Sequence, residues 1–216
     1  GRVTLREALV HSLNTASVRV LQRVGIDQVL GLLQQLGFSK LDPEGKDRAL
    51  GLALGGVVGG VSPLELARAY SVFASGGYLP DVRFVRRVLG PDGELWQEVG
   101  LRRRPVLDPV TAYLVTAILQ DVLTEGTAAG QGDVGVPAAG KTGTGEGDTD
   151  AWFVGYTPEM VASVWIGHDE VKPLDIGELP YASLLAVRVW VDFMDKVNPR
   201  PHGFYPPRGV VTTRIV

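Results

Sequence analysis

The sequence has no cysteine, no long apolar run and no excess of basic residues, and each absence excludes a class of protein. Without cysteine there is no disulfide framework and no thiolate metal site. The longest apolar run, Ala49–Val61, contains five glycines and falls short of the roughly 20 residues of a spanning helix. A net charge of −3 gives no electrostatic reason to expect nucleic acid as a partner. The three histidines lack metal-site spacing, so we expect neither a metal nor a cofactor.

The length of 216 residues allows one domain with a substantial core. The chain begins at Gly1 with no initiator Met and no signal peptide, so we expect a fragment of a longer protein. Pro199, Pro201, Pro206 and Pro207 predict a tail without regular structure. We therefore divide the chain into a folded part, residues 1–198, and a Pro-rich tail, residues 199–216.

The N-terminal region carries signals for three helices. Thr4 and Glu7 form a capping box, and the helical periodicity that follows is interrupted at Ser12–Asn14. Residues of these types bond to their own backbone, so we predict two short helices with a turn at Ser12–Asn14. Asp27 is predicted to cap a further helix that ends at Gly37.

Three later helices are predicted. The segment Ser62-Pro63-Leu64-Glu65 combines an N-cap, a proline at the first helical position and a capping-box glutamate, and its helix should reach about Ser75. Asp108-Pro109 opens a helix that should reach about Glu125. A closing helix is predicted over residues 181–197. Its expected buried residues are Leu184, Leu185, Val189 and Phe193.

Strands are predicted in two regions. Residues 82–89 and 94–99 flank a Pro-Asp-Gly turn, which indicates a β-hairpin. Alternating patterns predict strands at about 137–144, 151–157 and 160–168, and their short connections favour antiparallel pairing. The alternation of Trp152, Phe153 and Trp165 favours core packing for these side chains. Asp148 and Asp150 are expected to shape the loop between the first two of these strands.

The stretch GVPAAGKTGT, residues 135–144, fits two incompatible motifs. It satisfies G-x-x-x-x-G-K-[ST], the phosphate-binding loop of nucleotide-binding proteins. That motif needs a buried strand before it and a helix that begins at Lys141-Thr142, because the helix N-terminus holds the phosphate. The preceding segment, residues 125–134, is rich in glycine, and the following residues include Gly143, Gly145 and Gly147. This context argues against a nucleotide site.

The second motif is Lys141-Thr142-Gly143, the K-T-G of serine acyltransferases that react with β-lactams. It gains weight from Ser12-Leu13-Asn14, an S-x-N at the predicted helix break. A serine that attacks an amide needs proton transfer, donors for the oxyanion and an anchor for the substrate carboxylate. Lys141 can supply charge, threonine hydroxyls can donate hydrogen bonds, Ser12 can relay protons, and Asn14 can bind an amide.

Taken together, these motifs resemble the transpeptidase domain of penicillin-binding proteins, most closely the bifunctional class A type. The resemblance implies an α+β fold of the β-lactamase/transpeptidase type, with helices packed on an antiparallel sheet that has five strands when complete, and here incomplete at the N-terminus. The segments that carry it are Thr4–Asn14, Ser62–Tyr70, Gly140–Thr144, Asp150–Pro158 and Val164–Asp169.

The resemblance implies D,D-transpeptidation, the cross-linking of peptidoglycan stem peptides that end in D-Ala-D-Ala, with β-lactams acylating the same serine. It assigns catalytic roles to Ser12 as a proton relay, Asn14 as the group that holds the substrate amide, and Lys141 in the cleft. The backbone N–H of Thr144 would form half of the oxyanion hole. The substrate-binding residues that it implies are Thr142, Gly143 and Thr144.

One departure from the family pattern concerns the nucleophile. The family's nucleophilic serine lies in S-x-x-K, and none of the eight serines of this chain has lysine at the fourth position. We therefore expect a fragment that is inactive alone, with the N-terminal half of the domain supplied by a separate chain or by a segment removed before Gly1. By family, the protein should act on the outer face of the bacterial cytoplasmic membrane, anchored by a segment outside this chain.

Two alternative functions remain open from the sequence. The first is a non-catalytic penicillin-binding-like module that keeps the cleft wall and lacks S-x-x-K in its complete gene. The second is the nucleotide-binding protein, which depends on the phosphate-loop interpretation of Lys141.

Overall fold

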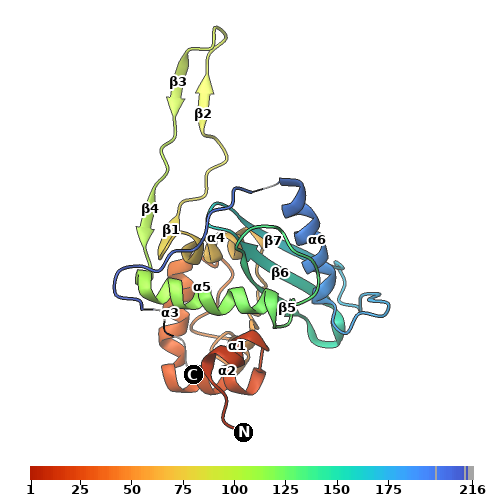
Figure 1. Cartoon of the computed structure of the whole chain (residues 1–216). Helices are drawn as coiled ribbons and strands as arrows, with labels where there is room; N and C mark the ends of the chain where they lie inside the picture. The colour runs from red at the N-terminus through yellow and green to blue at the C-terminus, as the bar shows by residue number, and fades with distance from the viewer. Residues whose placement is uncertain (198, 212, 214–216) are drawn as a thin grey trace.

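The computed structural model describes residues 1–197, 199–211 and 213, and their architecture is the expected α+β fold. Figure 1 shows a body of helices and one central sheet, from which a long β-arm projects. The helices are α1 (Leu5–Val10), α2 (Asn14–Val24), α3 (Ile26–Leu36), α4 (Pro63–Ala74), α5 (Pro109–Thr124) and α6 (Ser183–Val197), with short 3₁₀ turns η1 (Leu50–Leu54) and η2 (Glu146–Asp148). The strands are β1 (Tyr78–Pro80), β2 (Arg87–Leu89), β3 (Leu95–Glu98), β4 (Arg103–Pro105), β5 (Ala139–Thr144), β6 (Asp150–Tyr156) and β7 (Val161–Gly167).

The helix starts follow the capping signals with one exception. Thr4 caps α1 and Ser62 caps α4, each in a complete capping box, and the Asp108 carboxylate accepts two backbone hydrogen bonds at the start of α5. The predicted cap at Asp27 is wrong. Gly25 occupies the N-cap of α3 with no side-chain hydrogen bond, because a backbone at φ 93° and ψ 136° favours glycine, and Asp27 lies in the first turn.

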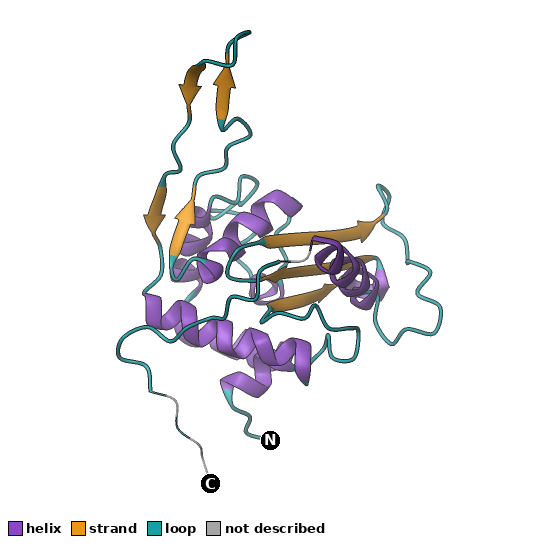
Figure 2. Cartoon of the chain, turned by 45° about the horizontal axis from the view of Figure 1, so that its top comes forward, coloured by secondary structure: helices purple, strands orange, loops and turns teal. Residues whose placement is uncertain are grey.

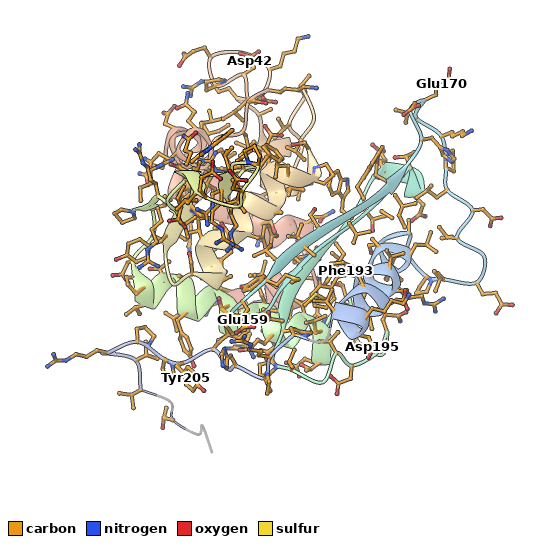
Figure 3. The ribbon with its side chains drawn as sticks, turned by 90° about the horizontal axis from the view of Figure 1, so that it is seen from above. Asp42, Glu159, Glu170, Phe193, Asp195 and Tyr205 are labelled. Carbon is orange, nitrogen blue, oxygen red and sulfur yellow. The ribbon has the colours of Figure 1, made fainter. Side chains whose placement is uncertain are left out.

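The central sheet is antiparallel in the order β5-β6-β7, as the short connections predicted. One face is covered by α6, which contacts all three strands, and the other by α4 and α5 (Figure 2). On the second face the Tyr156 hydroxyl lies 3.0 Å from Thr116 Oγ1 of α5. Figure 3 shows Glu159, in the β6–β7 turn, and Glu170, in the loop after β7, at opposite ends of this sheet.

The packing face of α6 differs from the prediction. Val187, Trp190 and Met194 are fully buried, whereas Val189 is 50% exposed and Phe193 is 44% exposed. Trp190 sets the face, because it fits over Gly155 of β6, where an added Cβ would lie 2.5 Å from the indole ring. The helix has apolar residues on two sides, and the side that packs on the sheet is the one that carries Trp190.

The predicted hairpin is present as a long arm with two short ladders. β2 pairs with β3 near the tip, and β1 pairs with β4 at the base. Of the two strands expected over 82–89 and 94–99, residues 82–86, 94 and 99 are not in a strand. The turn between β2 and β3 closes through Gly93 at φ 79°, a conformation that favours glycine. The arm is separate from both hydrophobic cores.

Two cores stabilise the body. The larger one joins α5, α6 and the central sheet, and the smaller one joins α2, α3 and η1 around Leu21, Leu30 and Leu52. The described part of the expected tail, 199–211 and 213, has no helix or strand. Its Phe204 nevertheless packs on Tyr156, with ring centroids 5.6 Å apart. Residues 198, 212 and 214–216 of the two expected segments lie outside the described residues.

Candidate active site

The turn between α1 and α2 presents Ser12 in a strained conformation. Ser12 has φ 53°, one of two non-glycine residues with positive φ among those described, and such a backbone costs about 1–2 kcal/mol for an L-residue. The turn is held by the bond from Leu13 N to Ala8 O, at 2.8 Å. The Ser12 side chain is thereby directed at β5, where Lys141 Nζ donates to Ser12 Oγ at 2.9 Å. The structure brings the two predicted motifs together.

Lys141 is partly buried between this turn and its own strand. Its ammonium group also donates to the backbone oxygen of Thr142 at 3.0 Å and contacts Thr142 Oγ1 at 3.4 Å. None of the described carboxylates forms an ion pair with it. Burial lowers the pKa of Lys141 to about 8, because the charged form loses hydration. At neutral pH this group is a cation that can release its proton at modest cost.

β5 forms an edge of the sheet and leaves peptide groups free for a ligand. Gly145 N donates to Asp150 O at 2.9 Å, so the peptide group at this position points toward β6. Peptide groups alternate along an antiparallel strand, so the N–H of Thr144 points to the opposite edge. No described strand pairs with that edge. A backbone N–H on the same strand as Lys141, facing an edge with no described strand partner, is a suitable donor for a developing oxyanion.

Packing on β6 requires glycine at Gly140 and leaves little room for a side chain at Gly143. An added Cβ at Gly140 would lie 2.5 Å from the Phe153 ring and 2.9 Å from Val154 O. At Gly143 it would lie 3.2 Å from Trp152 Cβ. Gly140 and Gly143 thus allow β5 to lie close to the large side chains of β6. Lys141 and Thr142 are the two residues between these glycines in the sequence.

Thr127 is a site residue that the sequence did not reveal. It was predicted only as part of a glycine-rich loop after the helix that ends near Glu125. Its hydroxyl oxygen lies 2.6 Å from Thr142 Oγ1, and its backbone N–H donates to Val10 O at 3.4 Å. A helix followed by Gly-Thr signals a chain reversal, but nothing in the local pattern indicates contact with a strand fifteen residues later.

Asn14 lies beside the site without a partner in it. It is exposed at the first position of α2, and no hydrogen bond of its side chain occurs among the described residues. Its amide is therefore free to bind a ligand that enters next to Ser12.

The two acidic residues expected to shape the loop after β5 also bond to segments outside it. Asp148 Oδ1 accepts from Ala182 N at 3.0 Å, and Asp150 Oδ1 accepts from the Trp165 indole at 2.8 Å. The predicted core packing is correct for Phe153, which is fully buried, and wrong for Trp165, which is 40% exposed. Trp165 stays near the surface because its N–H needs the Asp150 carboxylate, and its ring packs on Trp152 at 6.0 Å.

Comparison with known proteins places this geometry in a family. Residues 1–172 match the family model described as "Penicillin binding protein transpeptidase domain". The chain belongs to this family. The resemblance inferred from Ser12, Asn14 and Lys141 is confirmed at the level of the family.

The most similar relatives of this transpeptidase-family chain include two bacterial penicillin-binding proteins 1A. That of Neisseria cinerea is 38% identical over 221 residues, covering 99% of this chain and 27% of the relative. That of Aquifex aeolicus is 37% identical over 214 residues, covering 98% of this chain and 28% of the relative. The chain thus spans just over a quarter of the length of these curated relatives.

Solved structures establish the penicillin-binding-protein fold. Penicillin-binding protein 1A of Haemophilus influenzae superposes with a TM-score of 0.81 at 23% identity, covering 95% of this chain and 36% of that one. PonA1 of Mycobacterium tuberculosis, solved in complex with penicillin V, has a TM-score of 0.79 at 24% identity, covering 98% and 60%. These proteins share the helices and antiparallel sheet described above.

The phosphate-loop interpretation of the same lysine is wrong for this fold. Lys141-Thr142 lies inside β5, the next regular strand is β6, and the only helical turn between them is η2, with three residues. No helix begins at Lys141-Thr142, so no helix N-terminus is placed there to hold a phosphate. Across 1–197, 199–211 and 213 there is also no group of three or more side chains placed to hold a metal ion, and no helix has the length and apolar character needed to span a membrane.

Proposed function

We propose that this chain is the cleft-bearing part of a D,D-transpeptidase, which cross-links peptidoglycan stem peptides that end in D-Ala-D-Ala and is acylated by β-lactams. The observation that carries the proposal is the hydrogen bond from Lys141 Nζ to Ser12 Oγ at the open edge of β5. It is supported by membership of the family and by relatives whose structures hold penicillin V or imipenem.

The proposed roles follow from the positions of the side chains. When a serine attacks the amide, its proton must reach the nitrogen of the departing D-alanine. Ser12 Oγ, hydrogen-bonded to an ammonium group of lowered pKa, can donate its proton to that nitrogen and regain one from Lys141. Asn14 binds the substrate amide beside Ser12. The Thr144 N–H supplies one oxyanion donor.

The substrate carboxylate is proposed to bind along the K-T-G strand. It would accept hydrogen bonds from the threonine hydroxyls of Thr142 and Thr144, with Gly143 leaving the strand unobstructed between them. The ammonium group of Lys141 lies within reach of Thr142 Oγ1 and adds a positive potential. A terminal carboxylate is the feature that D-Ala-D-Ala peptides and penicillins share.

The nucleophile is proposed to come from an S-x-x-K segment outside these 216 residues. No serine of the chain is followed by lysine three positions later. The segment would belong to the N-terminal half of the domain, on the same or a separate chain, and the complete protein would work on the outer face of the cytoplasmic membrane. Residues 1–198 would form the C-terminal part of the transpeptidase domain and residues 199–216 its tail.

Fluorescent penicillin tests these proposals directly. The complete protein that contains this chain should form a covalent adduct that survives denaturation, and residues 1–216 alone should form none. Lys141→Ala in the complete protein should reduce the rate of adduct formation by at least about a hundredfold. An adduct on residues 1–216 alone would contradict the external nucleophile, and no adduct on the complete protein would contradict the transpeptidase.

A non-catalytic penicillin-binding module is the second candidate, and the absence of S-x-x-K from this chain is the observation that favours it. The two candidates differ in the codons upstream of Gly1. A transpeptidase gene encodes S-x-x-K there, and a gene for a binding module does not.

A further inference from the structure

Gly126 and Thr127 connect the two elements that carry the site. They follow Glu125, the C-cap of α5, and lie against the end of α1, since Thr127 N donates to Val10 O, two residues before Ser12. An added Cβ at Gly126 would lie 2.6 Å from that same oxygen and 2.8 Å from Val122 Cα, so the approach requires glycine. On its other side, Thr127 Oγ1 contacts Thr142 Oγ1 at 2.6 Å. Thr127 thus bonds both to the end of α1, next to the turn that carries Ser12, and to Thr142 of β5.

The hydroxyl of Thr142 has two hydrogen-bonding neighbours among the described residues, Lys141 Nζ and Thr127 Oγ1. A threonine hydroxyl can donate one hydrogen bond and accept two. Lys141 Nζ, at 3.4 Å, can only donate to it. If Thr127 also donates, both acceptor positions of Thr142 are filled from the protein, and its single proton is left free to bond to a ligand. If Thr142 donated to Thr127 instead, that proton would be turned away from a ligand.

We propose that Thr127 is a positioning residue, which donates to Thr142 and so directs the Thr142 proton at the substrate carboxylate. The inference rests on the proposed function, because it assumes that a carboxylate binds at β5. Thr127 has no direct contact with the ligand in this scheme. It orients the hydroxyl of Thr142, and its backbone bond to Val10 links that hydroxyl to the turn that presents Ser12.

The choice of variants separates the hydroxyl from the rest of the side chain. Thr127→Val keeps the shape and removes the donor, whereas Thr127→Ser keeps the donor and loses a methyl group. Thr124→Val is the matched control, because Thr124 lies on the same chain reversal at the end of α5 and its hydroxyl bonds only to Asp121 O, at 3.4 Å, among the described residues.

The first experiment measures acylation of the complete protein by benzylpenicillin and by its methyl ester, which lacks the carboxylate. Thr127→Val should slow acylation by benzylpenicillin about tenfold and acylation by the ester less than about twofold, because only the acid uses the directed proton. Thr127→Ser and Thr124→Val should stay within about twofold of the wild type for both. Equal slowing of acid and ester in Thr127→Val, or no rescue by serine, would overturn the proposal, since either outcome indicates a role in packing alone.

The second experiment does not need acylation, so it distinguishes failure of this inference from failure of the proposed function. The complete protein, labelled at threonine methyl groups, is titrated with N-acetyl-D-Ala-D-Ala and with the same peptide carrying a C-terminal amide. Thr142 should report tighter binding of the acid in the wild type and Thr127→Ser, and no preference in Thr127→Val. A retained preference in Thr127→Val overturns the role of Thr127, even if the wild type forms no penicillin adduct. A wild type that forms no adduct overturns the transpeptidase proposal alone.

Discussion

Lys141 Nζ donates to Ser12 Oγ across 129 positions of sequence, and this 2.9 Å bond joins the helical region to the central sheet. Both residues adopt states that cost free energy, one through backbone strain and the other through lost hydration. Ser12 adopts φ 53°, and Lys141 loses enough hydration for its pKa to fall to about 8. A strained turn and a desolvated cation in contact are typical of a reactive site, because the strain and the desolvation each cost folding free energy.

The pH dependence of acylation should report on Lys141. Its ammonium group is charged below a pH of about 8 and neutral above it, because burial lowers its pKa from 10.5. The proposed attraction for the ligand carboxylate is therefore present at pH 7 and lost as the pH rises. Acylation of the complete protein by benzylpenicillin should fall about tenfold between pH 7 and 9, measured by stopped-flow quenching of tryptophan fluorescence.

Lys141→Arg provides the matched control for this prediction. A guanidinium group stays protonated throughout this range, so the variant should be slower at pH 7 but lack the fall above pH 8. An unchanged fall in Lys141→Arg would assign the titration to another group and remove Lys141 from the carboxylate site.

Local chemistry made the starts of α1 and α4 predictable, whereas tertiary contacts decided which faces are buried. The Thr4 and Ser62 capping boxes satisfy backbone donors within four residues, so sequence alone locates them. The buried face of α6 depends on Trp190 meeting Gly155, which lies on a strand far away in sequence. Apolar residues on two sides of the helix left this choice open.

The residues of the candidate site also differ in whether the sequence could reveal them. Ser12 and Lys141 could be found because they stand in motifs whose spacing matches a family, and the structure places them in contact. Thr127 stands in no such motif, and its role comes only from the packing of Gly126 against Val10. Contacts created by chain reversal leave no periodic pattern in the residues that make them.

Ser12→Gly should separate stability from activity. Glycine adopts φ 53° without strain, which offsets its greater freedom in the unfolded chain and the lost hydrogen bond to Lys141. We expect the free energy of unfolding to stay within about 1 kcal/mol of the wild type, while penicillin acylation falls at least about tenfold through loss of the hydroxyl. Urea unfolding and adduct formation measure the two effects in the same preparation.

Ser17→Ala is the comparison for Ser12→Gly. Ser17 lies one turn along α2, and its hydroxyl bonds only to Leu13 O at 3.3 Å among the described residues. Its removal should leave acylation unchanged. Wild-type acylation in Ser12→Gly would show that the Ser12 hydroxyl takes no part in proton transfer.

Glu65 should make the domain sensitive to acid. Burial alone raises its pKa, but hydrogen bonds from the backbones of Ser39 and Ser62 and from the Ser62 hydroxyl outweigh this and lower the pKa to about 2. The folded-state pKa lies below the unfolded value, so its stabilisation is complete above pH 4.5 and is lost as the pH falls toward 2. After allowance for solvent screening, we expect this part of the acid destabilisation to amount to about 1–2 kcal/mol.

Glu65→Gln isolates that contribution. Glutamine can still complete a capping box but does not titrate, so the urea midpoint of the variant should fall less between pH 5 and 3 than that of the wild type. Parallel losses in the two proteins would show that the acid response comes from other carboxylates.

Gly126→Ala should damage the site through its geometry. The new methyl group would lie 2.6 Å from Val10 O and 2.8 Å from Val122 Cα, and both are backbone atoms that move only with their helices. The end of α1 must then shift away from α5, which moves Ser12 relative to Lys141. We expect a loss of about 1–3 kcal/mol in unfolding free energy and at least a tenfold slower acylation, because a displacement of about 1 Å can slow a reaction by up to about a hundredfold.

Gly31→Ala is the same substitution as Gly126→Ala, but it should stabilise the protein rather than destabilise it. Gly31 lies inside α3 with no other atom within 4 Å of an added Cβ, so alanine should raise the unfolding free energy by about 0.5–1 kcal/mol and leave acylation unchanged. The double variant Gly126→Ala/Gly31→Ala then tests whether the loss of activity follows stability or position. If restored stability also restores acylation, Gly126 acts through folding. If acylation stays low, the contact between Gly126 and Val10 sets the distance between Ser12 and Lys141.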